Sequence, residues 1–210
     1  ISGASKGIGV SIAELFAAAG CDIALTARNE KELEQTAENA RKAGVKVWTQ
    51  TAEMADADEV KAVGNAALAE FGHVDILVNN AGVTIPQPIL ETTLENFHTI
   101  INVNVLAPFL LTQIFAPSMI AKKKGKIVNV TSRAAIRAFP TGSVYSASKG
   151  ALQLLTQSMA VEFGPHNIQT NSVAPTVTMT PMGDNAWPPS PRRDAKLAKI
   201  PTGRFAEPEE

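Results

Sequence analysis

Short apolar runs alternate with amphipathic stretches along the chain. The runs that read as buried strands are 22–27, 45–51, 74–78, 126–130 and 168–174. The stretches with helical apolar spacing are 10–19, 29–43, 58–71, 91–121 and the segment that follows Tyr145. Strands joined by crossover helices run parallel, because each helix returns the chain to the same end of the sheet. The alternation therefore predicts an α/β fold, a doubly wound parallel sheet in a single domain.

The composition limits what such a domain can bind. With 210 residues, of which 45% are hydrophobic and 19% charged, the chain can bury one sizeable core. Its net charge of −1 creates no broad field for nucleic acid or an anionic membrane. The apolar stretch 99–121 contains Asn102, Asn104, Gln113 and two prolines, which argues against a membrane span. The single Cys21 excludes an internal disulfide and fits a reducing compartment. Together, the cysteine, the net charge and the polar residues of 99–121 predict a cytoplasmic protein without nucleic-acid or membrane partners.

Three glycines stand close together at the start of the chain, in the sequence SGASKGIG of residues 2–9. Gly3, Gly7 and Gly9 would let the backbone turn tightly and approach a pyrophosphate that sits on the N-terminus of the following helix. The same glycines could equally form an ordinary turn. A phosphate loop of this kind follows a strand, and only Ile1 precedes it here. We therefore expect the first strand of the sheet to lie outside this chain.

Two cations indicate which dinucleotide such a loop would bind. The second apolar run ends at Ala27 and Arg28, where an Asp or Glu would accept hydrogen bonds from an adenosine ribose. Arg28 and Lys6 instead suit a ribose 2′-phosphate, because charge-assisted contacts to phosphate are strong. The sequence thus favours NADP(H) over NAD(H). The alternative is that Arg28 only ends a strand in solvent.

The only tyrosine, Tyr145, is followed four residues later by Lys149. On a helix this spacing puts both side chains on one face, with Cβ atoms about 5–6 Å apart. An ammonium there should lower the pKa of the phenol from its usual value of about 10, so that Tyr145 can exchange a proton near neutral pH. Ser132 stands at the carboxyl end of the strand 126–130, where its hydroxyl could bind the same substrate oxygen. The alternative is a surface pair without chemistry.

Three further segments have less specific patterns. Asn104 lies four residues before Pro108, where the helix should kink, and its side chain could bond the freed backbone or hold a water. Residues 179–200 are rich in Pro, Arg and Lys, with Trp187 in the middle, and predict a mobile flap over a site. Residues 208–210, Pro-Glu-Glu, predict a helix start. We expect the last strand also to lie outside the chain, and the chain made alone to fold poorly.

Taken together, these residues resemble the short-chain dehydrogenase/reductase family over the whole chain. The matching elements, in family order and at family spacing, are Gly-x-x-x-Gly-x-Gly from Gly3, Asn79-Asn-Ala-Gly82, Asn104, Ser132 and Tyr145-x-x-x-Lys149. The resemblance implies a Rossmann-type sheet with helices on both faces. It also implies that Tyr145 is the general acid/base and that Ser132 polarises the substrate carbonyl. Lys149 would bind the nicotinamide ribose and lower the pKa of Tyr145, and Asn104 would hold a proton-relay water.

The same resemblance implies one dinucleotide-binding and catalytic domain, residues 1–210, with a substrate flap at about 179–200. The cofactor-binding residues would be Gly3, Ser5, Lys6, Gly7, Ile8, Gly9, Arg28, Asn29, Glu53, Asn80, Ala81, Gly82, Tyr145, Lys149, Pro175, Val177, Thr178 and Thr180. Glu53 stands where the family usually has an Asp that contacts adenine. The substrate would meet Ser132, Gly142, Tyr145 and Trp187, and no metal is expected.

Residues 164–180, with Trp187, are similar to the L-xylulose reductase (dicarbonyl reductase) subgroup of that family. Members of the subgroup carry a His three positions before the tyrosine, where this chain has Gly142, so its pocket wall loses a polar group and bulk. The resemblance implies an NADPH-dependent reductase of a small ketose, diketone or related ketone, acting reversibly and as a homodimer or homotetramer. Two alternatives stay open: a reductase of 3-oxoacyl thioesters or sterols, and a non-catalytic NADP-binding sensor or scaffold.

Overall fold

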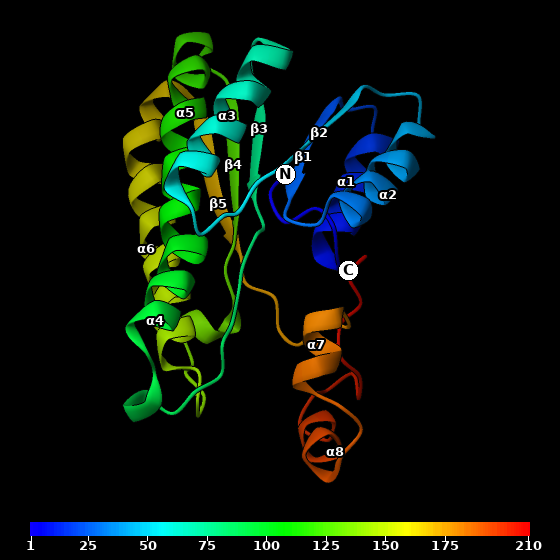
Figure 1. Cartoon of the computed structure of the whole chain (residues 1–210), viewed down its shortest axis with the longest axis vertical. Coiled ribbons are helices and arrows are strands. Elements are labelled where there is room, and N and C mark those ends of the chain that lie inside the picture. Colours follow the sequence, from blue (N-terminus) through cyan, green and yellow to red (C-terminus); the bar gives the residue numbers. More distant parts are fainter.

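The computed structural model describes residues 1–210 as parallel strands covered by helices (Figure 1). The strands are β1 (Ile23–Ala27), β2 (Val47–Thr51), β3 (Ile76–Asn79), β4 (Gly125–Val130) and β5 (Ile168–Val173). The helices are α1 (Ile8–Ala18), α2 (Glu30–Arg41), α3 (Ala57–Phe71), α4 (Leu94–Ile101), α5 (Ala107–Lys122), α6 (Ser143–Phe163), α7 (Pro181–Ala186) and α8 (Pro191–Leu197). β1 pairs with β2, and β4 lies between β3 and β5. The predicted α/β fold is confirmed.

The first two residues connect the two groups of strands. The amide of Thr26 in β1 donates to the carbonyl of Ile1 at 3.1 Å, and the amide of Ser2 donates to the carbonyl of Val78 in β3 at 3.1 Å. Ile1 and Ser2 thus lie between β1 and β3 and join them into one parallel layer. Ligands of such layers bind outside the carboxyl ends of the strands, so this edge is where a site is expected.

Two apolar clusters hold the helices on this layer. One packs α1 and α2 against β1, with Leu25 and Leu33 buried at its centre. The other packs α3 and α5 against β3 and β4 around Leu77, Phe115 and Ile127. Burying such a side chain contributes about 1.5–3 kcal/mol, so these clusters fix the strands whose ends carry the site.

The predicted helix 91–121 is two helices joined by a π-helical turn, η2 (Asn102–Leu106). The break therefore lies before Pro108 rather than at it. Pro108 directly follows the π turn and, because it has no N–H, cannot donate a hydrogen bond back to that turn. The stretch Leu94–Lys122 is long and apolar enough to cross a membrane, but half of its most apolar 18-residue window is buried inside the protein, and the stretch packs on α3, α6 and the sheet. It is therefore a core segment.

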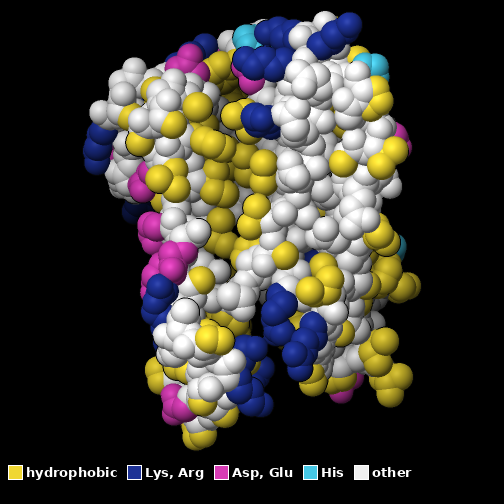
Figure 2. Space-filling model, turned by 180° about the vertical axis from the view of Figure 1, so that it is seen from behind, with side chains coloured by type: hydrophobic (Ala, Val, Ile, Leu, Met, Phe, Trp, Pro, Cys, Tyr) yellow, Lys and Arg dark blue, Asp and Glu magenta, His cyan; other side chains and the backbone are white.

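The segment 179–200 contains two short helices that form a lobe below the sheet in Figure 1. The hydroxyls of Thr180 and Ser190 cap α7 and α8 by accepting from the amides of Gly183 at 3.1 Å and Arg193 at 3.3 Å. A proline follows each cap, at the position where a helix tolerates it best. Figure 2, the view from behind, shows a hollow between this lobe and the rest of the molecule.

Residues 207–210 form a single turn, in which the Glu210 amide donates to the Glu207 carbonyl at 3.1 Å, so the helix start at 208–210 stays a prediction. The Glu210 carboxylate also accepts hydrogen bonds from the Arg204 guanidinium at 2.6 and 2.8 Å and from the Glu207 amide at 2.8 Å. These contacts close a turn. They lower the pKa of Glu210 to about 2, chiefly because the Arg204 hydrogen bonds favour the charged carboxylate.

Candidate active site

Ser132, Tyr145 and Lys149 lie together at the carboxyl end of β4. Ser132 follows that strand and caps the short turn η3 (Arg133–Ala135), its hydroxyl accepting from the Ala134 amide at 3.0 Å. Tyr145 and Lys149 stand one turn apart on α6, which packs against η3 and β5. The four-residue spacing therefore places the Tyr145 and Lys149 side chains on one face of α6 next to Ser132, as the sequence predicts.

Lys149 is almost fully buried. Its ammonium donates to the carbonyl of Val130 at 2.8 Å and lies 5.9 Å from the centre of the Tyr145 ring. A Cβ atom at Gly82 would stand 3.1 Å from the same nitrogen. The lack of a side chain at Gly82, just after β3, therefore leaves space for the ammonium. Burial lowers the pKa of Lys149 to about 8, because the charged form loses hydration.

Tyr145 has a pKa above its ordinary value in this structure. Burial raises it, and the Ser132 side chain opposes the shift by hydrogen bonding to the phenol oxygen. The Phe139 ring packs on Tyr145, with ring centroids 6.2 Å apart, and adds to its burial. The prediction of a lowered pKa is wrong here, because burial raises it and only the Ser132 hydrogen bond, not the Lys149 ammonium, opposes that shift. Tyr145 is thus protonated at neutral pH and can donate a proton.

The π turn places Asn104 beneath α6. Its amide nitrogen donates to the Ser148 hydroxyl at 2.9 Å and to the Val83 carbonyl at 3.0 Å, and its oxygen accepts from the Val83 amide at 2.9 Å. Ser148 in turn donates to the Tyr145 carbonyl at 2.7 Å. Of the two interpretations that the sequence left open, backbone bonding is the one that the Asn104 side chain shows. These bonds fix Tyr145 and its helix against the segment after β3.

Asn80 fastens the glycine loop to the end of β3. Its side-chain nitrogen donates to the carbonyls of Ser2 and Gly3 at 3.0 and 3.1 Å. The backbone amides of Asn80 and Ala81 donate to the Ser2 hydroxyl at 3.2 and 3.1 Å. Gly3 has a φ of 67°, and a Cβ atom on it would stand 2.8 Å from the Ala81 Cα. Gly3 is therefore required for the packing of the loop against Ala81, and its contact with a cofactor stays a prediction.

Gly9 is the most crowded glycine of this loop, and Gly9→Ala should distort it. A Cβ atom there would lie 2.2 Å from the Gly3 carbonyl oxygen and 2.7 Å from the Asn80 side-chain nitrogen. We expect a loss of about 1–3 kcal/mol in the free energy of unfolding and weaker cofactor binding, because the backbone must move. Thermal melts and cofactor titrations check this against Gly164→Ala, whose Cβ meets nothing within 4 Å. Equal effects of the two substitutions would contradict the role given to crowding.

The glycine loop, α1 and Thr180 form a cradle whose donors fit a phosphate. α1 begins at Ile8 without a side-chain cap and without an acidic residue in its first turn. Its unpaired amides and its dipole therefore favour an anion. Gly7 has a φ of 55°, and a Cβ atom on it would stand 2.7 Å from the Thr180 side chain, which closes the cradle from the opposite side. The cradle thus fits the pyrophosphate of a nicotinamide dinucleotide.

Both cations predicted to bind a 2′-phosphate are ion-paired. Lys6 binds Glu32 at 2.8 Å and Arg28 binds Glu53 at 3.4 Å, all through side chains at least one-third exposed. Exposed pairs contribute about 0–1 kcal/mol, so a dianionic phosphate can displace the carboxylates. Asn29 caps α2 by accepting from the Glu32 amide at 3.1 Å. The Glu53 carboxylate faces Arg28 here.

Residues 175–180 run from the Ser132 turn to the cradle. The Pro175 carbonyl accepts from the first amide of η3 at 3.1 Å. The Val177 carbonyl accepts from the Ala206 amide at 3.0 Å, and Thr178 lies in the same bridge. The predicted cofactor residues of this segment therefore span the space between the two halves of the site.

Two predicted substrate residues have other neighbours than expected. A Cβ atom at Gly142 would stand 2.2 Å from the Phe139 ring, so Phe139 already fills that space. The pocket wall thus lacks the polar group but not the bulk, which corrects the prediction. Trp187 packs on Phe205, with ring centroids 6.0 Å apart, and lies 4.5 Å from the Arg192 guanidinium. It belongs to the packing of the α7–α8 lobe.

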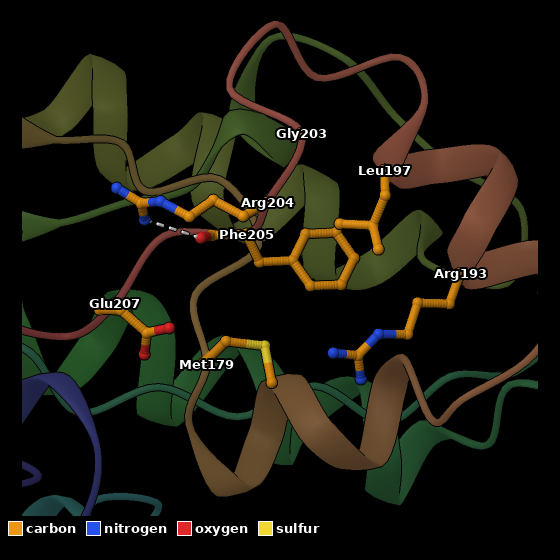
Figure 3. A pocket seen from close by; sticks show the side chains of 7 residues that line it. All are labelled: Met179, Arg193, Leu197, Gly203, Arg204, Phe205 and Glu207. Carbon is orange, nitrogen blue, oxygen red and sulfur yellow. Dashed lines mark hydrogen bonds between the residues drawn. The ribbon is translucent and has the colours of Figure 1, made fainter.

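A pocket of about 200 Å³ lies inside this lobe (Figure 3). The residues that line it are Met179, Arg193, Leu197, Gly203, Arg204, Phe205 and Glu207. In Figure 3 the Met179 and Arg193 side chains approach one another beside the Phe205 ring. None of the predicted site residues lines this pocket, so it is distinct from the candidate active site.

Three residues that position the site were not predicted: Ser2, Phe139 and Ser148. Ser148 lies inside the Tyr-x-x-x-Lys motif, three residues after Tyr145, and that spacing could have indicated a shared face. Ser2 opens the glycine loop, where a short hydroxyl suits a tight turn. Phe139 lies in a loop without periodicity, and nothing in the sequence indicates that its ring reaches Tyr145.

The chain belongs to the short chain dehydrogenase family, whose pattern matches residues 1–190. It is therefore an oxidoreductase that uses a nicotinamide cofactor. It is 43% identical over 208 residues to L-xylulose reductase of Bos taurus, in a match that covers 99% of this chain and 82% of that protein. It is 37% identical to D-threitol dehydrogenase of Mycolicibacterium smegmatis, covering 100% of this chain and 80% of that protein.

Among solved structures, the chain is similar to a gluconate 5-dehydrogenase from Burkholderia cenocepacia in complex with NADP and tartrate. The TM-score is 0.91 at 31% identity, covering 100% of this chain and 82% of that one. The resemblance to the family that the motifs predicted, and to L-xylulose reductase within it, is confirmed.

Proposed function

We propose that the protein reduces the ketone of a small ketose, diketone or related ketone with NADPH, and oxidises the corresponding alcohol in reverse. The observation that carries this proposal is the position of the Tyr145 phenol, beside the Ser132 hydroxyl and near the Lys149 ammonium. This arrangement can polarise an oxygen and protonate it at the same place. The relatives named L-xylulose reductase and D-threitol dehydrogenase support a ketose or polyol as the substrate.

In this proposal Ser132 and Tyr145 both donate hydrogen bonds to the substrate oxygen. A bound nicotinamide supplies the hydride. As negative charge develops on the oxygen, Tyr145 transfers its proton to it while Ser132 stabilises the charge. Lys149 binds the nicotinamide ribose, and its positive charge favours the phenolate that proton transfer leaves behind.

We propose that the π turn around Asn104 contributes to proton transfer through its backbone carbonyl groups. Its side-chain amide already binds Val83 and Ser148, so we propose that a proton-relay water is held by the carbonyl groups that the π turn releases from helical bonding. Such a water would resupply the proton that Tyr145 gives up.

We propose that the cofactor lies across the carboxyl edge of the sheet. The glycine loop with Ser5, Ile8 and the start of α1 would hold the phosphates. Arg28, Asn29, Glu53 and residues 80–82 would hold the adenosine side, and residues 175–180 the nicotinamide. The chain would then form one catalytic domain in which the α7–α8 lobe closes over the substrate.

The choice of NADP(H) predicts a selective effect of removing two cations. Lys6→Ala combined with Arg28→Ala should raise the KM for NADPH about 10-fold or more and leave the KM for NADH unchanged, because only NADPH carries the 2′-phosphate. Steady-state kinetics with each cofactor check this. Arg41→Ala is the control, since Arg41 is an ion-paired cation at the other end of α2. Parallel losses with both cofactors would contradict the assignment.

A substrate panel tests the proposed function itself. Consumption of NADPH, and separately of NADH, is followed with xylulose, diacetyl and an acetoacetyl thioester. We expect oxidation of NADPH with xylulose or diacetyl. Turnover of the thioester alone would instead favour a 3-oxoacyl reductase. Cofactor binding without turnover of any carbonyl compound would favour a sensor or scaffold.

We further propose a cytoplasmic homodimer or homotetramer. Leu154 and Val161 on α6 are 65% and 78% exposed, and Leu90 and Leu94 near the start of α4 are 97% and 76% exposed. Apolar side chains this exposed suit a contact between copies of the chain. Light scattering of the full-length protein would give a monomer mass if this is wrong.

A further inference from the structure

Cations from two distant segments face one another beside the candidate active site. Arg133 and Arg137 lie on the turn and loop that follow Ser132, whereas Lys196 lies on α8 and Lys199 just after it. Figure 2 shows Lys and Arg side chains on both walls of the hollow between the α7–α8 lobe and the rest of the molecule. Burial, and then the charges of Arg133, Arg137 and Lys199, lower the pKa of Lys196, so the segments are close enough for their charges to repel.

These cations have no carboxylate partners. None of the four forms an ion pair within 4 Å; six other cations of the chain do, and the remaining ones, Lys122 and Arg192 among them, do not. Arg133 and Lys196 are half-buried and have lost part of their hydration, whereas Arg137 and Lys199 are exposed. Like charges that are partly desolvated and unpaired destabilise a fold, and an anion between them relieves that cost.

The loop that carries the two arginines also forms a wall of the active site. Arg133 directly follows Ser132 in the chain. Arg137 lies two residues before Phe139, whose ring packs on Tyr145. An anion held by this loop and α8 would therefore lie next to a substrate whose oxygen meets Ser132 and Tyr145.

We propose that Arg133, Arg137, Lys196 and Lys199 bind a carboxylate or phosphate group of the substrate, so that the preferred substrate is an anionic hydroxyketone. This proposal rests on the proposed function and specifies its substrate class. An arginine guanidinium matches the two oxygens of a carboxylate or phosphate, and a lysine adds a mobile charge. Binding an anion would also draw α8 toward the Ser132 loop, because both supply contacts to the same group.

The test compares substrates that differ only in charge. The full-length protein is assayed with a neutral pentulose, the keto-aldonate of matching length and the phosphate ester of the pentulose. We expect kcat/KM for at least one anionic substrate to exceed that for the pentulose about 10-fold or more, because a hydrogen bond to a charged group is worth that factor. Comparing the keto-aldonate with the phosphate ester shows whether the cluster binds a carboxylate or a phosphate. Equal values for neutral and anionic substrates overturn the proposal.

Two substitutions connect that preference to the cluster. Lys196→Gln and Arg137→Gln should each lower kcat/KM for the preferred anion about 10-fold and leave that for the pentulose and the KM for the cofactor unchanged. Lys122→Gln, which removes an exposed charge at the end of α5, is the matched control and should change none of these values. A rise in the cofactor KM in the two variants would overturn the proposal, because the cluster would then serve the cofactor.

Other outcomes separate this proposal from the proposed function. If no ketone is turned over, the proposed function fails, and titration calorimetry of the keto-aldonate and the phosphate ester tests the cluster directly. Binding of either that is lost in Lys196→Gln supports the cluster, and binding of neither overturns it. If only a thioester on an acidic carrier protein is reduced, the cluster binds a macromolecule and the proposal is wrong.

Discussion

Tyr145→Phe should lower turnover of any ketone about 100-fold or more, while the protein keeps its fold and its affinity for the nicotinamide cofactor. The substitution removes only the phenolic oxygen, so the ring still packs on Phe139 and α6 keeps its bonds through Ser148 to Asn104. What is lost is the phenolic O–H that donates the proton. No other phenol exists in the chain to replace it.

Stopped-flow turnover, a thermal melt and a cofactor titration check this result together. The melt and the titration should match those of the wild type, which separates loss of chemistry from loss of structure. If the variant keeps a tenth or more of the turnover, Tyr145 is not the proton donor, and the substrate oxygen receives its proton elsewhere.

Lys149→Met should abolish efficient turnover and also change how stability depends on pH. The pKa of Lys149 is lowered from 10.5 to about 8 in the folded protein. Between these two pH values the unfolded chain binds more protons than the folded one, so the free energy of unfolding rises with pH. Below pH 8 the folded protein carries the full cost of a buried ammonium. The stability that the folded protein gains when Lys149 is deprotonated is therefore fully present above pH 10.5 and is lost as the pH falls through 8.

The expected size of this change is about 3 kcal/mol, from a pKa difference of about 2.5 units. Denaturant unfolding of both proteins at pH 7 and pH 10.5 measures it: the wild type should gain that amount relative to Lys149→Met. The Tyr145 titration is common to both proteins, so it largely cancels in the difference. Lys122→Met, which removes an exposed lysine, should show no such change. A constant difference between wild type and Lys149→Met would mean that the ammonium is hydrated in the folded protein.

Local spacing explains why much of the site could be predicted from the sequence. The four-residue interval between Tyr145 and Lys149 defines one helix face, and Ser132 follows a recognisable strand. Similarly, the alternation of strands and helices left few arrangements for the sheet. These inferences need only neighbours in the sequence.

The errors arose where distant residues meet. The pKa of Tyr145 was predicted from the adjacent ammonium alone, but its burial depends on Phe139 and on the packing of α6. The space at Gly142 was predicted to be open, and the same Phe139 fills it. The crowding at Gly3 and Gly9 was not predicted either, because part of it comes from Asn80 and Ala81, more than 70 residues away along the chain.

The cationic cluster also could not be predicted from the sequence, because its members come from distant segments. Arg133 and Arg137 precede Lys196 and Lys199 by about 60 residues, and neither pair forms a run that would stand out in the sequence. Only the fold brings α8 and the Ser132 loop near enough for these charges to interact. A charge that is unremarkable in the sequence can thus mark a binding group once the fold shows that it has no partner.

Hydride transfer from NADPH to the carbonyl carbon of a ketone can be tested directly with an isotope label. The full-length protein is incubated with NADPH that carries deuterium at the reactive carbon of the nicotinamide, together with the ketone that it turns over best. Mass spectrometry and NMR of the alcohol locate the label. We expect deuterium on the former carbonyl carbon of the wild-type product, transferred from one face of the nicotinamide. Oxidised cofactor without labelled alcohol would show that the site does not transfer a hydride to a ketone.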